Sequence, residues 1–260
     1  MSIYQQYAEY CQTQLHLNKT DWDFKNNPNY TYMLEHVNKM QANQYLNIIQ
    51  NKFKALYKNN LELLTDTCKL NDLFGKTNKC DFIEFMECSP TNLRYILHSL
   101  LILEYIDEKK LNNIDFIEIG GGYGGLCVFI HKLAPLFNIN INSYTIFDLV
   151  EASKLQHKYL NALDIDNVKC YQLDNYNDIK HNSFLVSTYA FSEIPGEIQR
   201  EYIEKIINPF TKYGFIAWNN IPVYEFVNNS IIVAETEYPI TSNSGYNAYV
   251  RFYPREYKSV

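Results

Sequence analysis

The sequence has few of the features that mark secreted, membrane-spanning or metal-stabilised chains. Its six cysteines form no C-x-x-C pair, which disfavours a zinc ribbon or a redox motif. The opening stretch, MSIYQQYAEYCQ, lacks the charged start and apolar run of a secretory signal, and no apolar stretch approaches the length that crosses a bilayer. We therefore expect a cytoplasmic protein with reduced thiols and no membrane span.

Positive charge is also scarce. Lys and Arg number 23 against 29 Asp and Glu, which gives a formal net charge of −6, and no basic run marks a nucleic-acid surface. Hydrophobic residues make up 47% of the 260, so a chain of this length can bury a core without disulfides. The negative net charge and the lack of a basic run together disfavour a nucleic-acid partner.

The N-terminal region, residues 1–110, reads mostly as helix and loop. Apolar residues between 32 and 58 recur at a rough helical spacing. A clearer helix follows Ser89 and Pro90, which suit the N-cap and the first helical position, and its apolar stripe runs to Tyr105. We expect this region to act as a cap, or to contact substrate or another copy of the chain.

Short apolar segments alternate with helical patterns after Asn113. We expect strands at 114–119, 142–147, 168–171, 183–188 and 213–218, and helices from the glycines to about 136, at 151–162 and at 197–207. Two late strands, 231–236 and 246–253, have no helix between them and should pair antiparallel. The pattern predicts an α/β, Rossmann-like domain over 111–260, with a doubly wound, mostly parallel sheet and an antiparallel edge strand.

A glycine-rich turn carries the most specific signal. Gly120, Gly122 and Gly125 match G-x-G-x-x-G after a predicted strand and before a predicted helix, and Tyr123 lies inside this expected cofactor site. The pattern alone fits dinucleotides and S-adenosylmethionine about equally. Glu118 favours the second, because a carboxylate there would repel a pyrophosphate and would suit the cationic methionine end.

Acidic residues also follow the next two predicted strands. Asp148, with Leu149 beside it, stands where a carboxylate accepts hydrogen bonds from ribose hydroxyls. Asp174 and Asn175 follow the third strand and are assigned to the adenine, although both residue types are equally at home in turns. Acidic residues at three consecutive strand ends are a more specific signal for a cofactor site than any one of them alone.

These residues resemble class I methyltransferases, and more closely the sugar O-methyltransferases of bacterial surface-polysaccharide gene clusters. The closer resemblance spans about 89 to 220 and is carried by SPTNLRY at 89–95, EIGGGYGGL at 118–126, YTIFDL at 144–149 and TYAFSE at 188–193. It implies a Rossmann-like domain, S-adenosylmethionine as donor, S-adenosylhomocysteine as product and a sugar hydroxyl as acceptor. Val150 stands where the family often has proline, which should alter the local turn without removing Asp148.

The side chains after the fourth and fifth predicted strands are the best placed to contact an acceptor. Glu193 is a candidate general base or sugar-binding group, and Tyr189 a candidate for orienting the acceptor. Ser192 is a candidate substrate contact that also suits a turn or a helix cap. Asn219 and Asn220 would bind sugar hydroxyls.

Three residues of the helix after Pro90 complete the candidate site. Arg94 would bind a phosphate or a nucleotide-sugar diphosphate, and Tyr95 is grouped with it as a substrate contact. His98 shares the face of Arg94 and is a second candidate base, although a lone histidine on a helix is more often structural.

Methyl transfer to oxygen uses a donor that is already activated, so the protein must align the acceptor and move its proton. No closely spaced carboxylate pair calls for Mg²⁺, and we expect no metal. The rivals are an NAD-type oxidoreductase, which predicts an apolar residue at 118, and an inactive nucleotide-binding module. Among methyltransferases, a non-sugar small molecule or a phosphate-linked glycan is the alternative acceptor. The sequence determines neither the identity of the acceptor sugar nor whether the chain forms a homo-oligomer.

Overall fold

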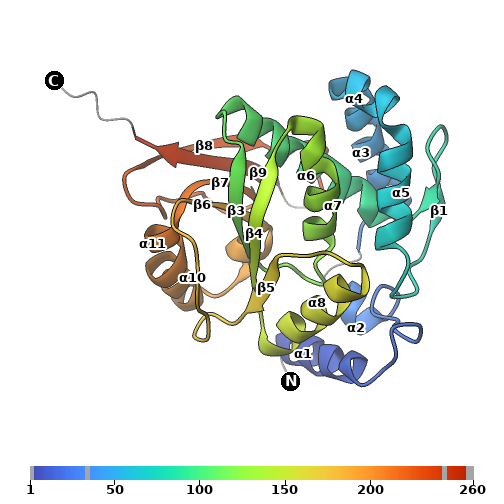
Figure 1. The fold of residues 1–260 in the computed structure, drawn as a ribbon, viewed down its shortest axis with the longest axis horizontal. Helices are drawn as coiled ribbons and strands as arrows, with labels where there is room; N and C mark the ends of the chain where they lie inside the picture. The colour runs from blue at the N-terminus through green and yellow to red at the C-terminus, as the bar shows by residue number, and fades with distance from the viewer. Residues whose placement is uncertain (1–2, 33–35, 242–244, 256–260) are drawn as a thin grey trace. The chain divides into compact units, whose positions relative to one another are not determined.

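The computed structural model describes residues 3–32, 36–241 and 245–255 (Figure 1). The chain forms two compact units that interleave along the sequence. The first holds the residues up to Asn113 together with Gly122–Asn140 and Leu149–Val168, and the second holds Ile114–Gly121, Ile141–Asp148 and the residues from Lys169 onward. The expected boundary at residue 110 stays a prediction, since these units do not follow a single cut in the sequence.

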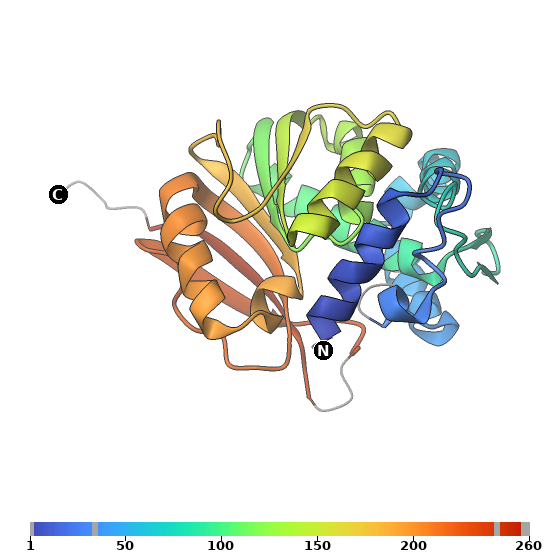
Figure 2. The same cartoon turned by 90° about the horizontal axis from the view of Figure 1, so that it is seen from below.

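The first unit is mainly helical. Its elements are α1 (Ile3–Leu15), α2 (Pro28–Thr31), α3 (Lys39–Lys52), α4 (Lys54–Asn59), α5 (Leu61–Asn71), the hairpin β1 (Cys80–Asp81) and β2 (Glu87–Cys88), α6 (Pro90–Glu108), α7 (Gly125–Leu133), the 3₁₀ turn η1 (Ala134–Phe137) and α8 (Val150–Ala162). Helix α1 lies along α8 (Figure 2), and α6 packs against both α3 and α7. Most of the length of α6 is buried.

Local sequence explains where several helices begin and end. The Oγ of Ser89 accepts a hydrogen bond from the Thr91 N–H ahead of Pro90, as the cap prediction required. The helical spacing expected over 32–58 is instead two helices, because a capping box of Asn38 and Gln41 starts α3 and the backbone departs from helical geometry at Phe53. Residues 33–35 of that range lie outside the described residues.

The second unit is built on a seven-stranded sheet. Its strands are β3 (Asn113–Ile119), β4 (Asn140–Phe147), β5 (Val168–Tyr171), β6 (Ser183–Thr188), β7 (Thr211–Trp218), β8 (Ser230–Thr236) and β9 (Ala248–Pro254), in the order β5-β4-β3-β6-β7-β9-β8. Strands β3, β6 and β7 pair in parallel, and β9 pairs antiparallel with both β7 and β8. The predicted Rossmann-like sheet with an antiparallel edge is confirmed.

The strand order separates this sheet from the dinucleotide-binding fold. Counted along the chain it reads 3-2-1-4-5-7-6, which shares its first five places with the parallel order 3-2-1-4-5-6 of dehydrogenases. The last strand of the chain, β9, is then inserted antiparallel between β7 and β8.

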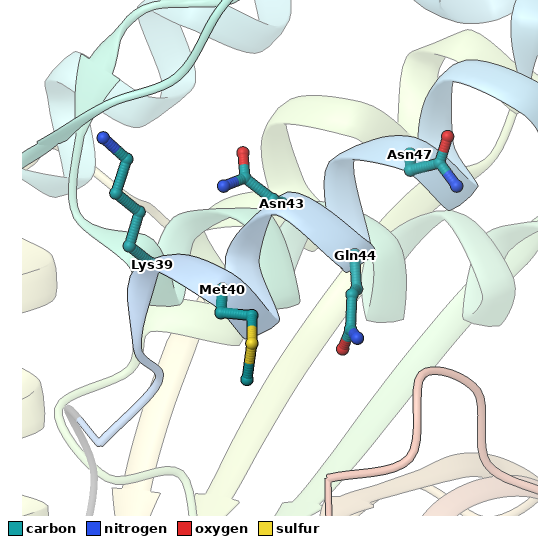
Figure 3. Close-up of a pocket in the computed structure, with 5 residues that line it drawn as sticks. All are labelled: Lys39, Met40, Asn43, Gln44 and Asn47. Atoms are coloured by element: carbon teal, nitrogen blue, oxygen red, sulfur yellow. The ribbon is translucent and has the colours of Figure 1, made fainter.

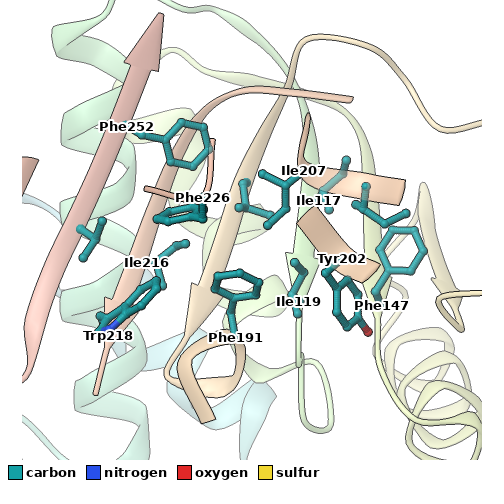
Figure 4. Packing of buried hydrophobic residues seen from close by; sticks show 13 residues of the cluster. Ile117, Ile119, Phe147, Phe191, Tyr202, Ile207, Ile216, Trp218, Phe226 and Phe252 are labelled. Atoms are coloured by element: carbon teal, nitrogen blue, oxygen red, sulfur yellow. The ribbon is translucent and has the colours of Figure 1, made fainter. Parts of the chain in front are cut away.

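One face of the sheet is covered by α9 (Ala190–Glu193), α10 (Gly196–Tyr202), the π-helical stretch η2 (Ile203–Ile207) and α11 (Asn208–Phe210). Figure 4 shows the core between them, where Phe191 and Phe226 pack against Trp218, and Tyr202 packs against Phe147. Packing in this apolar core fixes the positions of β3, β6 and β7, and so the positions of the residues that follow each strand.

Candidate cofactor and acceptor site

The carboxyl ends of β3, β4 and β5 meet at one edge of the sheet. The Gly120 N–H, just after β3, donates to the carbonyl of Phe147 at the end of β4 (2.8 Å), and the Asp148 N–H donates to the carbonyl of Tyr171 at the end of β5 (3.1 Å). Ligands of open α/β sheets bind outside these strand ends. The predicted anchors therefore follow three adjacent strands at the expected edge.

Gly120 is required by the local geometry. Its φ is +75°, and a Cβ built on it would stand 2.1 Å from the Cβ of Ala190, at the start of α9. Any larger residue would strain the backbone and push α9 away. The end of β3 thus packs tightly on the loop that follows β6.

Glu118 lies beside this turn with 1% of its surface exposed. The Tyr144 hydroxyl donates to its Oε2 at 2.9 Å. Burial raises the pKa of Glu118 to about 8, and the nearby Asp148 acts in the same direction, whereas the hydrogen bond from Tyr144 opposes them. With this pKa the carboxyl group is largely protonated at pH 7, and it becomes complementary to a cationic ligand group once it gives up that proton.

The remaining predicted anchors differ in how exposed they are. Asp148 is half-buried, and burial together with the charges of Asp148 and Glu118 raises the pKa of the Cys170 thiol to about 12. Leu149 is 40% exposed. Asp174 is exposed and forms an ion pair with Lys205 (2.7 Å), so a ligand would have to share its carboxylate with that ammonium. Its neighbour Asn175 is also exposed.

The second half of the glycine-rich turn belongs to the first unit. Gly122 and Gly124 have φ values of +59° and +94°, and Gly125 begins α7. A Cβ at Gly125 would come within 2.5 Å of the Tyr95 ring. The side chain of Tyr123 is fully buried among other aromatic rings, so its predicted contact with the cofactor would come from its backbone.

Four predicted residues meet where β6 and β7 end. Tyr189 has φ of +70° and its N–H donates to the Ala217 carbonyl at 2.7 Å. The Asn219 amide Nδ2 donates to Glu193 Oε1 (2.8 Å), and its backbone N–H donates to Ser192 Oγ (3.0 Å). A positive φ at a bulky residue is costly and is found where function or packing demands it. The structure brings these side chains together, and their roles stay predictions.

Sequence reasoning missed Glu237, which follows β8 and is 1% exposed. The Tyr189 hydroxyl donates to its Oε1, and the Thr241 hydroxyl donates to its Oε2 at 2.7 Å. Its sequence, Glu-Thr-Glu at 235–237, resembles an exposed edge strand, so no local signal marks it. The predicted Asn220 lies against Gly245, where an added Cβ would come within 2.4 Å of its amide.

The three predicted residues on α6 are buried within the first unit. Arg94 is 7% exposed and lies 5.9 Å from the centre of the Tyr95 ring. His98 is fully buried against Tyr45, and burial, with a smaller effect of Arg94, lowers its pKa to about 3. An imidazole of that pKa is a poor base near neutral pH, so these surroundings disfavour His98 as the base.

A hollow of about 530 Å³ lies on the exposed side of α3 (Figure 3). Its lining carries one ammonium group, one thioether and three amides, from Lys39, Met40, Asn43, Gln44 and Asn47. None of these residues was predicted from the sequence. Across the described ranges, no cluster of three or more His, Cys, Asp or Glu could hold a metal ion, and no helix has the length and apolar character to cross a bilayer.

The chain matches no protein-family model, and no curated protein is similar to it in sequence. Among solved structures it is similar to magnesium protoporphyrin IX methyltransferase (ChlM) of Synechocystis PCC 6803 with bound SAM, with a TM-score of 0.44 and 11% identity over 63% of this chain and 81% of that chain. It is also similar to PKMT2 of Rickettsia typhi in complex with AdoHcy, with a TM-score of 0.34 and 18% identity over 42% of this chain and 22% of that chain. A third match is a pericyclic reaction enzyme, with a TM-score of 0.40 and 12% identity over 55% of this chain and 43% of that chain. Similarity this weak assigns no family, and the Rossmann-like fold is established by the sheet itself.

Proposed function

We propose that this protein is an S-adenosylmethionine-dependent O-methyltransferase that methylates a hydroxyl group of a sugar, nucleotide-activated or glycan-linked, in the synthesis of a surface polysaccharide. The observation that carries the proposal is the edge formed by the ends of β3, β4 and β5. There a buried carboxyl group, Glu118, adjoins the positive-φ Gly120 and the half-buried Asp148.

The donor set at this edge fits S-adenosylmethionine better than a dinucleotide. Glu118 would bind the cationic methionine end, Asp148 the ribose hydroxyls, and Asp174 with Asn175 the adenine. A pyrophosphate would instead be repelled by the Asp148 carboxylate and would gain no ion pair from Glu118, whose carboxyl group burial keeps largely protonated near neutral pH. The antiparallel β9 also departs from the parallel sheet of dehydrogenases. Both observations disfavour the NAD-type oxidoreductase.

When bound, S-adenosylmethionine supplies a methyl group already activated on a sulfonium. The chain must then hold the acceptor hydroxyl and take its proton. Glu193, exposed and oriented by the Asn219 amide at 2.8 Å, is the proposed base. Tyr189, whose hydroxyl is held by Glu237, would orient the acceptor, and the amides of Asn219 and Asn220 would bind neighbouring sugar hydroxyls.

The sugar as acceptor rests on the resemblance at 89–95 and 188–193 and on the amide, hydroxyl and carboxylate groups gathered where β6 and β7 end. Such groups bind hydroxyls through neutral and charge-assisted hydrogen bonds. They select no particular sugar. A phosphate-linked glycan or a non-sugar small molecule is the alternative acceptor, and the test includes both.

The test is calorimetric titration of S-adenosylhomocysteine into the wild type, Asp148→Ala and the control Asp166→Ala, which removes an exposed carboxylate. We expect micromolar binding to the wild type and the control, and a loss of at least tenfold in affinity for Asp148→Ala. Radiolabelled S-adenosylmethionine is then offered with nucleotide sugars, glycan phosphates and small phenols. Binding of NAD instead of S-adenosylhomocysteine would refute the proposal. Binding without transfer to any acceptor would indicate an inactive module.

A further inference from the structure

Lys25 is a lysine buried inside the first unit, with 1% of its surface exposed. Removing an ammonium group from water costs several kcal/mol unless other groups replace its hydration. Here the ammonium donates to the Asn71 carbonyl and to the Tyr159 hydroxyl, the latter at 2.9 Å. It also lies 4.4 Å from the centre of the Tyr123 ring and 4.8 Å from that of Tyr159, within the range of cation–π attraction.

The groups that hold Lys25 also hold the glycine-rich turn. Tyr123 stands between Gly122 and Gly124, and its hydroxyl accepts a hydrogen bond from the Asn71 amide at 3.2 Å. The Tyr159 hydroxyl donates to the Asn71 carbonyl at 2.8 Å. The Lys25 ammonium thus contacts both Asn71 and Tyr159 as well as the ring of Tyr123 itself.

Tyr123 matters because its neighbours do not fix the backbone. Gly122 and Gly124 both have positive φ, and glycine pays little steric penalty for leaving such a conformation. The turn is therefore set by what holds it from outside. One such group is the Gln156 amide of α8, which donates to the Gly122 carbonyl at 2.8 Å, and another is the buried side chain of Tyr123.

The chain is shaped to admit the lysine side chain. Gly75 has φ of +96°, and a Cβ there would stand 2.8 Å from Lys25 Cγ. The carbonyl of Gly75 accepts the Lys25 backbone N–H at 2.9 Å. An apolar residue of similar length at position 25 would fill this space without the cost of a buried charge.

We propose that Lys25 is a positioning residue that fixes the glycine-rich turn, through the ring of Tyr123, in the conformation that binds S-adenosylmethionine. This inference rests on the proposed function. It gives the segment before α2 a part in cofactor binding, although no residue of that segment lies in the sequence motif. Lys25 acts through Tyr123 and need not contact the cofactor.

The first experiment compares Lys25→Met with Lys158→Met by calorimetric titration of S-adenosylhomocysteine. Lys158 is a half-buried control, whose ammonium also binds two carbonyl groups, those of Leu15 and Leu17, and lies 5.4 Å from the Trp22 ring. We expect the Kd to rise at least tenfold in Lys25→Met and less than twofold in Lys158→Met, with both proteins folded by circular dichroism.

A second variant separates positioning from stability. Lys25→Ala removes three methylene groups and the ammonium, which together correspond to propylammonium. Added propylammonium should restore the affinity for S-adenosylhomocysteine, whereas 1-propanol, of similar size and without charge, should not. Where Lys25→Met and Lys25→Ala fail to fold, Tyr159→Phe removes one partner of Lys25 and keeps the ring, with an expected three- to tenfold loss.

The outcomes distinguish the inference from the function on which it rests. A wild type that binds no S-adenosylhomocysteine overturns the proposed function, and the role of Lys25 with it. A wild type that binds, with Lys25→Met or Tyr159→Phe binding equally well, overturns the role of Lys25 alone. Equal losses in Lys25→Met and Lys158→Met would also overturn it, because the effect would then be general.

Discussion

The carboxyl group of Glu118 shows how burial prepares a site for a charged ligand. With a pKa near 8, it is largely protonated at pH 7, and a cation placed beside it would draw the proton off. Binding and proton release are then coupled. Affinity should rise with pH below 8, by at most about tenfold per pH unit, and level off above it.

This coupling is measurable by titrating S-adenosylhomocysteine into the protein at pH 7 in phosphate and in Tris, which differ in ionisation enthalpy. We expect the wild type to release close to one proton on binding. Glu118→Gln should bind more weakly and release none, while its Tyr144 partner is kept. Equal heats in the two buffers for the wild type would contradict the assignment of Glu118 to the cationic end of the ligand.

At the scale of the elements, one side-chain contact joins the loops after β6 and β8. The Tyr189 hydroxyl donates to Glu237, and the Glu237 N–H donates to the Asn247 carbonyl at 2.8 Å, just before β9. The contact fixes the direction of the Tyr189 hydroxyl. Under the proposed function, it would set the geometry at which Tyr189 orients an acceptor.

Tyr189→Phe tests this contact, because it keeps the aromatic ring and removes the hydroxyl. We expect the affinity for S-adenosylhomocysteine to stay within twofold, and methyl transfer to fall about 10- to 100-fold, because an acceptor that is held out of line with the methyl group reacts more slowly. The measurement is initial rate against acceptor concentration, with the best acceptor from the panel.

Tyr224→Phe is the matched control, since it removes a hydroxyl that donates to Gln199 at 2.8 Å, away from Glu237. Its rate should stay within twofold of the wild type. A loss of cofactor affinity in Tyr189→Phe equal to its loss of rate would show that Tyr189 serves the fold of the site rather than the acceptor.

The strands, and the positions of the candidate anchors at their ends, could be predicted from the sequence because their signals are local, while the roles of those residues stay predictions. An apolar run followed by glycine or an acid marks where β3 and β4 end, and Ser89 with Pro90 marks the start of α6. Glu237 and Lys25 could not be predicted, because their partners lie far along the chain. Glu237 contacts Tyr189, 48 residues away, and Lys25 contacts Tyr159, 134 residues away. Nothing in their neighbouring residues indicates those contacts.

At the scale of the whole molecule, the two compact units are each assembled from segments that alternate along the chain. Helices α7 and α8, which connect β3 to β4 and β4 to β5, group with the N-terminal helices in the first unit, and the expected domain boundary at residue 110 stays a prediction. Periodicity identifies each helix but not the unit in which it is packed. The turn at 120–125 consequently begins in one unit and ends in the other.

Two fully buried groups with opposite pKa shifts, one in each unit, should shape the pH dependence of stability. The pKa of His98 falls from 6.5 to about 3, so the unfolded chain gains a proton below pH 6.5 that the folded chain does not, and stability is lost as the pH falls. The pKa of Glu118 rises from 4.5 to about 8, so the folded chain keeps a proton that the unfolded chain releases, and stability is lost as the pH rises.

Each group changes the free energy of unfolding by at most about 1.4 kcal/mol per pH unit, and the two effects oppose each other between pH 4.5 and 6.5. We therefore expect the free energy of unfolding, measured with urea from pH 4 to 9, to be flat in that interval and to fall on both sides. Glu118→Gln should remove much of the fall above pH 6.5, and His98→Gln much of the fall below pH 4.5, whatever each substitution does to the absolute stability.

Because the comparison uses the shape of each curve rather than its height, a packing defect would shift a curve without changing its slope. Variant curves parallel to the wild type would show that neither group titrates differently in the folded and unfolded chain.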